Sequence, residues 1–409
     1  MGRVAGVSPR EVSMSGPLVG SNRGFVESAD GLHDAARKAV SCDDFGDPAY
    51  LEGFRVLTEA YDRESRLTPA GRAMVETQLL GILENRLATQ KAWTENPAIL
   101  RNEIRQPIFV LGLARTGTTA LHHLLSQDPN LQVLEYWLAA APSPRPPRTQ
   151  WEADPRYQRA VQELDWTYKR DPSLRAMHLM TADGPDECRH LFQQNLTDDT
   201  FDCNATIPSY SDWYGRQDML ATYGRHRDLL KLIGSTSPER RWLLKYPVHM
   251  GNLHALFATY PDACIVQTHR DPCRVIPSIC SLVTGWRGLY EEGVDRAAVA
   301  RWLIELWATR LERGLAVRRG RDSRSFFDLH FREILADPVG TVKRIYDHFG
   351  IEMTHAATAR FQAWVGENPR GKYGAHRYRA EDFGLAEDMI ADRFGTYMKH
   401  FQIERERAA

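Results

Sequence analysis

Residues 108–125, IFVLGLARTGTTALHHLL, combine an apolar run, a polar turn and a helical pattern in the order of a phosphate-binding loop. Gly112, Gly117 and Thr119 fall on the two glycine positions and the hydroxyl position of the loop G-x-x-x-x-G-K-S/T. Thr118 stands at the lysine position, whose side chain reaches the β- and γ-phosphates of a nucleotide. The pattern predicts a phosphate site and leaves open which phosphate is held without that lysine.

The residue types of this turn suit an anion. Its two glycines let the backbone curl so that successive N–H groups point inward, and a helix that begins near Gly117 adds its positive N-terminal end. The side chains of Arg115, Thr116, Thr118 and Thr119 add further donors. The alternative is an ordinary strand-to-helix turn with glycine and threonine caps. The apolar run before the turn favours the anion site.

A second stretch, THRDPCRVIPS at residues 268–278, has an arginine at the end of an expected strand and a serine on the next helix. Asp271 is a good N-cap, and Pro272 suits the first helical position. Arg270 and Ser278 are therefore placed to converge on one phosphate. By itself the stretch is more typical of a solvated arginine beside a capped helix.

A third stretch, NPRGKYGAHRYRAEDFG at residues 368–384, is a basic loop after the helix-breaking Pro369. It contains glycines and four arginine and lysine residues, a composition equally typical of a solvated surface loop. Together the three stretches predict a nucleotide that carries phosphates at both ends of its ribose.

The chain as a whole has the composition of a soluble globular protein, with 409 residues, 43% hydrophobic and 26% charged. Its net charge of −1 supplies no field that would draw it to nucleic acid or to an anionic membrane. Six cysteines occur without a C-x-x-C pair, no apolar run is long enough to cross a membrane, and the start lacks the apolar centre of a signal peptide. We expect a cytoplasmic protein with reduced cysteines, no nucleic-acid partner and no stable membrane insertion.

The elements that must position these residues alternate between strand and helix patterns. The apolar runs in QPIFVLGL, RWLLKYP, DACIVQTHRDP and SRSFFDLHF predict strands covered on both faces, and PVGTVKRIYDHFG predicts a helix closed by Gly350. These patterns predict an α/β fold of the P-loop type, with three layers and a mainly parallel central sheet. We expect a flexible N-terminus over 1–25, a helical segment over 26–104, and an α/β domain over 105–409 with an inserted cap at about 135–240.

The combination of ARTGTT, LKYPVH and THRDP resembles the sulfotransferases that use 3′-phosphoadenosine 5′-phosphosulfate (PAPS), and more narrowly their bacterial branch. The resemblance implies that the 5′-phosphosulfate lies, without a metal, on the loop residues Arg115, Thr116, Gly117, Thr118 and Thr119. Such a donor has no β–γ phosphate pair, which accounts for the missing lysine.

The resemblance also implies how the second phosphate of the donor, and of its product adenosine 3′,5′-bisphosphate, is held. Arg270 and Ser278 would bind the 3′-phosphate. The basic loop at Arg370, Gly371 and Lys372 would close over it.

The family's base is commonly a histidine two residues after a lysine. Lys245 matches that lysine, but the histidine, His249, is four residues further on. Pro247 would have to reshape the segment to bring His249 into the site. In other branches the base is a glutamate, for which Glu187 and Glu135 are available. His249 is the first candidate and Glu187 the second, and Lys245 would stabilise the leaving phosphate.

The sequence does not name the acceptor. The aromatic residues of 151–240 suggest a hydroxyl or amine on a small molecule, lipid or glycolipid. The N-terminal helical segment would either cover this pocket or form the contact of a homodimer. Two other functions stay open: a P-loop kinase or NTPase, which Thr118 disfavours, and a non-catalytic nucleotide-binding protein.

Overall fold

The computed structural model describes residues 23–172, 174–175, 179–369 and 379–406. Residues 1–22, for which the sequence predicts flexibility, lie outside this part. Three helices open the described chain: α1 (Ala29–Val40), α2 (Tyr50–Glu64) and α3 (Pro69–Glu95). The sequence signal for the start of α3 is confirmed, because the Thr68 hydroxyl accepts a hydrogen bond from Gly71 N and Pro69 takes the first position.

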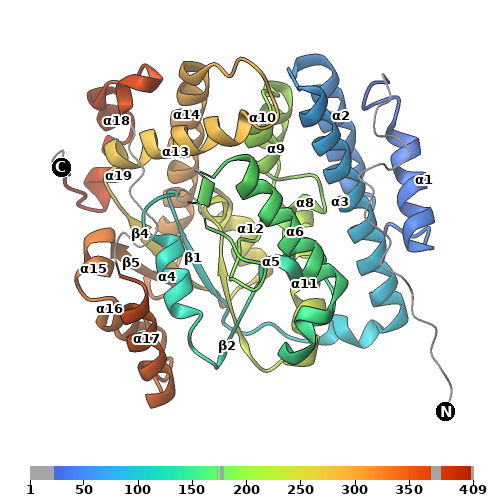
Figure 1. Ribbon diagram of the computed structural model, residues 1–409. Coiled ribbons are helices and arrows are strands. Elements are labelled where there is room, and N and C mark those ends of the chain that lie inside the picture. Colours follow the sequence, from blue (N-terminus) through green and yellow to red (C-terminus); the bar gives the residue numbers. More distant parts are fainter. Residues whose placement is uncertain (1–22, 173, 176–178, 370–378, 407–409) are drawn as a thin grey trace, which may run out of the picture.

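A five-stranded sheet with only parallel pairs lies at the centre of the fold (Figure 1). Its strands are β1 (Ile108–Gly112), β2 (Leu131–Val133), β3 (Arg241–Lys245), β4 (Cys264–His269) and β5 (Phe326–His330). The spatial order is β2-β3-β1-β4-β5, so β1 is the central strand. All five residues of β1 are buried, as expected for a strand covered on both faces.

Helices cover both faces of the sheet, which makes three layers. Ile108 and Val110 of β1 face the core that contains Leu121 of α4 (Thr118–Leu125), α16 (Pro338–Phe349) and α17 (His355–Glu367). Phe109 and Leu111 belong to the second core, which extends through the remaining helices except α15. The alternation follows from the two-residue period of a strand.

In the described part of the connection from β2 to β3, the regular elements are helices, joined by irregular segments. It contains α5 (Tyr136–Ala140), α6 (Pro155–Arg170), α8 (Arg189–Gln193), α9 (Thr200–Asn204), α10 (Pro208–Tyr214) and α11 (Leu220–Ile233). The later helices are α12 (Leu253–Thr259), α13 (Pro272–Arg287), α14 (Arg296–Arg319), α15 (Phe331–Ala336), α18 (Glu387–Arg393) and α19 (Gly395–His400). In Figure 1, α1–α3 stand on the opposite side of the molecule from α15–α19.

The predicted α/β fold with a parallel sheet is confirmed. Strands form within the four predicted apolar runs, and Gly350 closes α16 with a left-handed φ of 64°. The three-residue β2 was not predicted, because so short a strand carries no periodic signal. Within the described residues, no helix is both long and apolar enough to cross a membrane.

Candidate active site

The loop between β1 and α4 is curled by backbone conformations that need glycine. Gly112 has a φ of 143°, and a Cβ there would lie 2.5 Å from Thr268 O. Gly117 has a φ of 93°, and a Cβ there would lie 2.8 Å from the Phe331 ring. Arg115, between them, has a φ of 71° although it is not glycine. The two glycines therefore permit both the turn and its close packing against β4 and α15.

The threonines of this loop make two kinds of contact, one with β4 and one with Lys245. Thr116 is fully buried; its hydroxyl donates to Leu113 O (2.6 Å) and shares a hydrogen bond with Thr268 Oγ1 (2.5 Å). Thr118 begins α4, and the Thr119 hydroxyl lies 3.4 Å from Lys245 Nζ. Thr116 ties the loop to β4, whereas Thr119 links it to the end of β3.

The structure brings the first and second stretches together. Arg115 Nε donates to Ser278 Oγ at 3.3 Å, which joins the loop to α13. Arg270 lines the same cavity as these two residues. Its guanidinium lies 4.3 Å from the centre of the Phe331 ring and donates to both carboxylate oxygens of Glu406, at 2.9 and 3.0 Å. Asp271 caps α13 by accepting from Cys273 N, as predicted.

The third stretch is described only at its edges. Arg370, Gly371 and Lys372 lie outside the described residues. Asn368 and Pro369, the first two residues of the stretch, line the cavity.

Lys245 and Glu187 form an ion pair beside the loop. Lys245 ends β3, its side chain is 2% exposed, and its Nζ lies 2.5 Å from Glu187 Oε1. Glu187 lines the cavity and precedes α8. A nearly buried ammonium group therefore touches both a carboxylate that faces the cavity and the loop between β1 and α4.

His249 lies on the 3₁₀ helix η4 (Pro247–Asn252), with no exposed surface, and it is not among the residues that line the cavity. Its Nδ1 is 2.6 Å from the Tyr223 hydroxyl, and its ring packs edge-on against Phe109 and Phe192. Burial, with a smaller effect of His226, holds the pKa of His249 well below its usual range. The structure therefore does not bring the first candidate base to the cavity.

Glu135, the other glutamate considered, is also held away from the cavity. Its Oε2 lies 3.0 Å from Arg145 Nη2, and Arg145 Nε donates to the same oxygen at 3.2 Å. Burial raises the pKa of Glu135, and the charge of Arg145 opposes the shift. This ion pair has the environment of a structural contact. Among the three candidate bases, only Glu187 lines the cavity.

The cavity that opens over the loop has a volume of about 1530 Å³. Its walls come from α3, α6 and α13, besides the residues around the ion pair. Much of these walls is apolar, through Met74, Leu80, Ile82, Leu164, Trp166, Ile279, Leu282, Val283 and Trp286. Polar and charged side chains, among them Glu76 and Glu84 of α3, also line the cavity. A large cleft whose surface is mainly apolar is typical of a site for a sizeable organic ligand.

The contribution of α3 to this cavity is a feature that sequence reasoning left undecided. Leu79, Leu83 and Leu87 face the core, while Met74 and Leu80 line the cavity. Apolar residues on more than one face of a helix are a signal that it is covered on two sides. That signal, present at 74–87, was available from the sequence.

Comparison with known proteins identifies the family. A model of the sulfotransferase family matches residues 107–355, which include the loop, Lys245 and Arg270. Sulfotransferase STF1 from Mycobacterium tuberculosis H37Rv has 39% sequence identity and a TM-score of 0.82, covering 91% of this chain and 100% of that one. Sulfotransferase STF9 from Mycobacterium avium has 26% identity and a TM-score of 0.86, covering 93% and 98%.

A further relative is the omega-hydroxy-beta-dihydromenaquinone-9 sulfotransferase Stf3 of Mycobacterium bovis. It is 24% identical over 310 residues, which are 72% of this chain and 76% of that protein. The family model covers more than half of the chain and the whole predicted phosphate loop. This chain therefore belongs to the sulfotransferase family.

Proposed function

We propose that this sulfotransferase moves a sulfuryl group from PAPS to a hydroxyl at the end of a long apolar lipid. One observation carries the proposal: Glu187 faces a large apolar cavity while it touches Lys245, which in turn reaches the phosphate loop. A proton acceptor, a cation and an anion-binding loop thus lie in sequence along one wall.

The donor's 5′-phosphosulfate would lie on the loop from Arg115 to Thr119. Backbone N–H groups at the start of α4 and the Arg115 guanidinium supply the positive field, so no metal is needed to hold this group. The 3′-phosphate would lie between Arg270 and Ser278, with Arg370, Gly371 and Lys372 closing over it. The contact between Arg115 and Ser278 supports this assignment, because it joins the two phosphate positions.

The acceptor would lie with its apolar chain between α3, α6 and α13. The cavity of about 1530 Å³ includes the residues assigned to the donor, and it exceeds the usual 300–1,000 Å³ of a pocket for one small ligand. It therefore has room for an extended acceptor chain beside the donor. The relative Stf3 is named for a menaquinone, an isoprenoid lipid, which supports the same class of acceptor.

Glu187 would take the proton of the acceptor hydroxyl while the acceptor oxygen attacks sulfur. The bond between sulfur and the bridging phosphate oxygen breaks, and a new bond forms between sulfur and the acceptor oxygen. Lys245 would stabilise the charge that develops on the released phosphate. The contact of its ammonium group with the Thr119 hydroxyl keeps that group close to the loop. The proton remains on Glu187 until product leaves.

The test of the donor uses thermal unfolding of the full chain in metal-free buffer. Adenosine 3′,5′-bisphosphate should raise Tm without metal, and ATP with magnesium should not. The reverse pattern would favour the kinase alternative for this site. Transfer of ³⁵S-sulfate from labelled PAPS should then be measured with a hydroxylated isoprenoid quinone and with a short-chain alcohol. Equal kcat/KM values for the two alcohols would contradict the lipid acceptor, and no transfer to any hydroxyl would favour a non-catalytic nucleotide-binding protein.

A further inference from the structure

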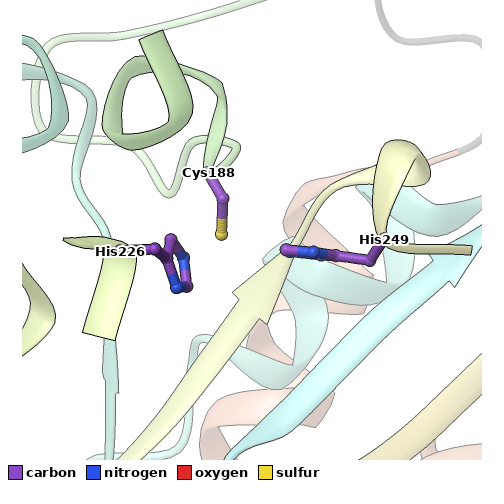
Figure 2. Close-up of side chains that lie close together, drawn as sticks. All are labelled: Cys188, His226 and His249. Carbon is purple, nitrogen blue, oxygen red and sulfur yellow. The ribbon is translucent and has the colours of Figure 1, made fainter. Parts of the chain in front are cut away.

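Cys188, His226 and His249 meet in the core, away from the cavity. Each side chain places one potential ligand atom within 4.8 Å of the corresponding atoms of the other two. Figure 2 shows the Cys188 sulfur between the two imidazole rings. Cys188 lies at the start of α8, His226 on α11 and His249 on η4. All three side chains are fully buried.

The two histidines of this cluster are held in the same way. His226 Nδ1 lies 2.8 Å from the Tyr260 hydroxyl, and His249 Nδ1 lies 2.6 Å from the Tyr223 hydroxyl. The Nε2 atom of each is buried and has no hydrogen-bond partner within the described part of the chain. A buried ring nitrogen without a partner costs stability, so two of them on histidines that cluster with one thiol require an explanation.

We propose that Cys188, His226 and His249 form a binding site for a soft metal ion, Cu⁺ or Zn²⁺. One thiolate and two neutral imidazoles are ligands that these ions prefer. The tyrosine hydroxyls would act as the outer partners that orient the imidazoles, as commonly found for histidine ligands. Binding releases the thiol proton to solvent, because the thiolate is the ligand.

The geometry requires only a small contraction. Bonds of about 2.0–2.3 Å place the ligand atoms of a three- or four-coordinate ion about 3.3–4 Å apart. Because the ligand atoms lie within 4.8 Å of one another, the three side chains would close by up to about 1.5 Å around an ion, a distance within reach of side-chain rotations. With three ligands and one thiolate, Cu⁺ would leave no net charge in the core, whereas Zn²⁺ would need a fourth donor.

The site would brace the ion pair proposed for catalysis. Cys188 directly follows Glu187, and its backbone N–H donates to Lys245 O at 3.2 Å. His249 lies one turn beyond Lys245 on the segment that leaves β3. An ion bound by both segments would fix the backbone that carries Glu187 relative to the end of β3.

The test measures metal binding to the full chain under reducing conditions. Cu⁺ is titrated against bicinchoninate, and Zn²⁺ is titrated separately against a colorimetric chelator. The wild-type protein should bind one equivalent of one of the two ions so tightly that the chelator does not remove it. Cys188→Ala and His226→Gln should each weaken that binding by more than about 100-fold. Cys280→Ala is the matched control, because it removes a fully buried thiol from α13, outside the cluster, and should bind as wild type does.

X-ray absorption of the loaded wild-type protein gives a readout that does not depend on the folding of any variant. We expect one sulfur at about 2.3 Å and nitrogen at about 2.0 Å from the metal. The inference is wrong if the wild-type protein yields both ions to the chelators, or if the metal has no sulfur neighbour. It is also wrong if Cys188→Ala folds and binds the ion as tightly as wild type.

Discussion

The Lys245 ammonium group lies 2.5 Å from the Glu187 carboxylate and 3.4 Å from the Thr119 hydroxyl. These three residues are far apart in the sequence and come from β3, from the chain before α8 and from α4. One nearly buried cation therefore connects the proposed base to the proposed phosphate site, and its charge is available to both groups.

Glu187→Gln should lower kcat by about 10²–10⁴-fold, because the amide cannot take the acceptor proton. The affinity for adenosine 3′,5′-bisphosphate, measured by calorimetry, should stay within a few-fold of wild type. His249→Gln, assayed side by side, should act mainly through stability, since His249 is buried behind the cavity wall. If a folded His249→Gln loses turnover while Glu187→Gln keeps it, the base is not Glu187.

Arg270 allows a prediction about donor affinity. Its guanidinium forms an ion pair with Glu406, which would compete with a bound phosphate. Arg270→Ala should weaken bisphosphate binding by about 10–100-fold through loss of a charge-assisted contact. Glu406→Gln should strengthen binding by a few-fold, since it removes a competing carboxylate. Glu404→Gln is the matched control: Glu404 pairs with exposed Arg332 at 3.0 Å, and its loss should leave affinity unchanged. Equal affinities in all four proteins would remove Arg270 from the phosphate site.

Gly81 offers a way to fill the cavity without disturbing the fold. It lies on α3, lines the cavity, and has nothing within 4 Å of an added Cβ. Gly81→Leu should lower kcat/KM for a long-chain lipid acceptor about tenfold or more by occupying its volume, while helix propensity improves. Gly224→Leu on α11, also in open space but outside the cavity lining, should leave the rate unchanged. A Gly81→Leu enzyme with normal kinetics would place the lipid chain elsewhere.

Asp202 makes the stability of the protein depend on pH. Burial raises the pKa of this α9 carboxyl to about 8, while its hydrogen bond with Ser211 and the charges of Arg287 and Arg310 oppose the shift. The folded state then binds more protons than the unfolded state between about pH 4 and pH 8. The free energy of unfolding should therefore fall as pH rises through this range, by up to about 1.4 kcal/mol per pH unit from this group.

The measurement is denaturant unfolding at several pH values between 5 and 8. Asp202→Asn should flatten the pH profile, because the amide cannot ionise. Asp165→Asn, which changes an exposed carboxylate on α6, should leave the profile as in wild type. Parallel profiles for wild type and Asp202→Asn would mean that Asp202 does not gain a proton on folding.

Local rules account for the parts of the fold and site that were predicted from the sequence. The apolar runs of β1, β3, β4 and β5 indicate strands, and Asp271 caps α13 through a contact only two residues away. The curled loop also follows locally from the glycines at 112 and 117. The family resemblance at residues 108–125, 241–249 and 268–278 rested on these same short segments.

The position of the proposed base could not be predicted in this way. Lys245 and His249 are four residues apart, yet η4 turns the chain between them, so that Lys245 faces the loop and His249 packs against Phe109 and Phe192 in the core. Glu187 meets Lys245 only because the chain before α8 packs against the end of β3.

The sequence by itself determined the α/β class, the parallel strands, the curled loop after β1 and the sulfotransferase resemblance, because each depends on residues close together in the chain. Tertiary structure alone decided which cavity α3 lines with the second of its apolar faces, that Glu187 rather than His249 faces this cavity, and that Cys188, His226 and His249 meet in the core. These contacts join segments separated by tens of residues. Their geometry depends on how whole helices pack on the sheet, which short-range propensity and spacing do not encode.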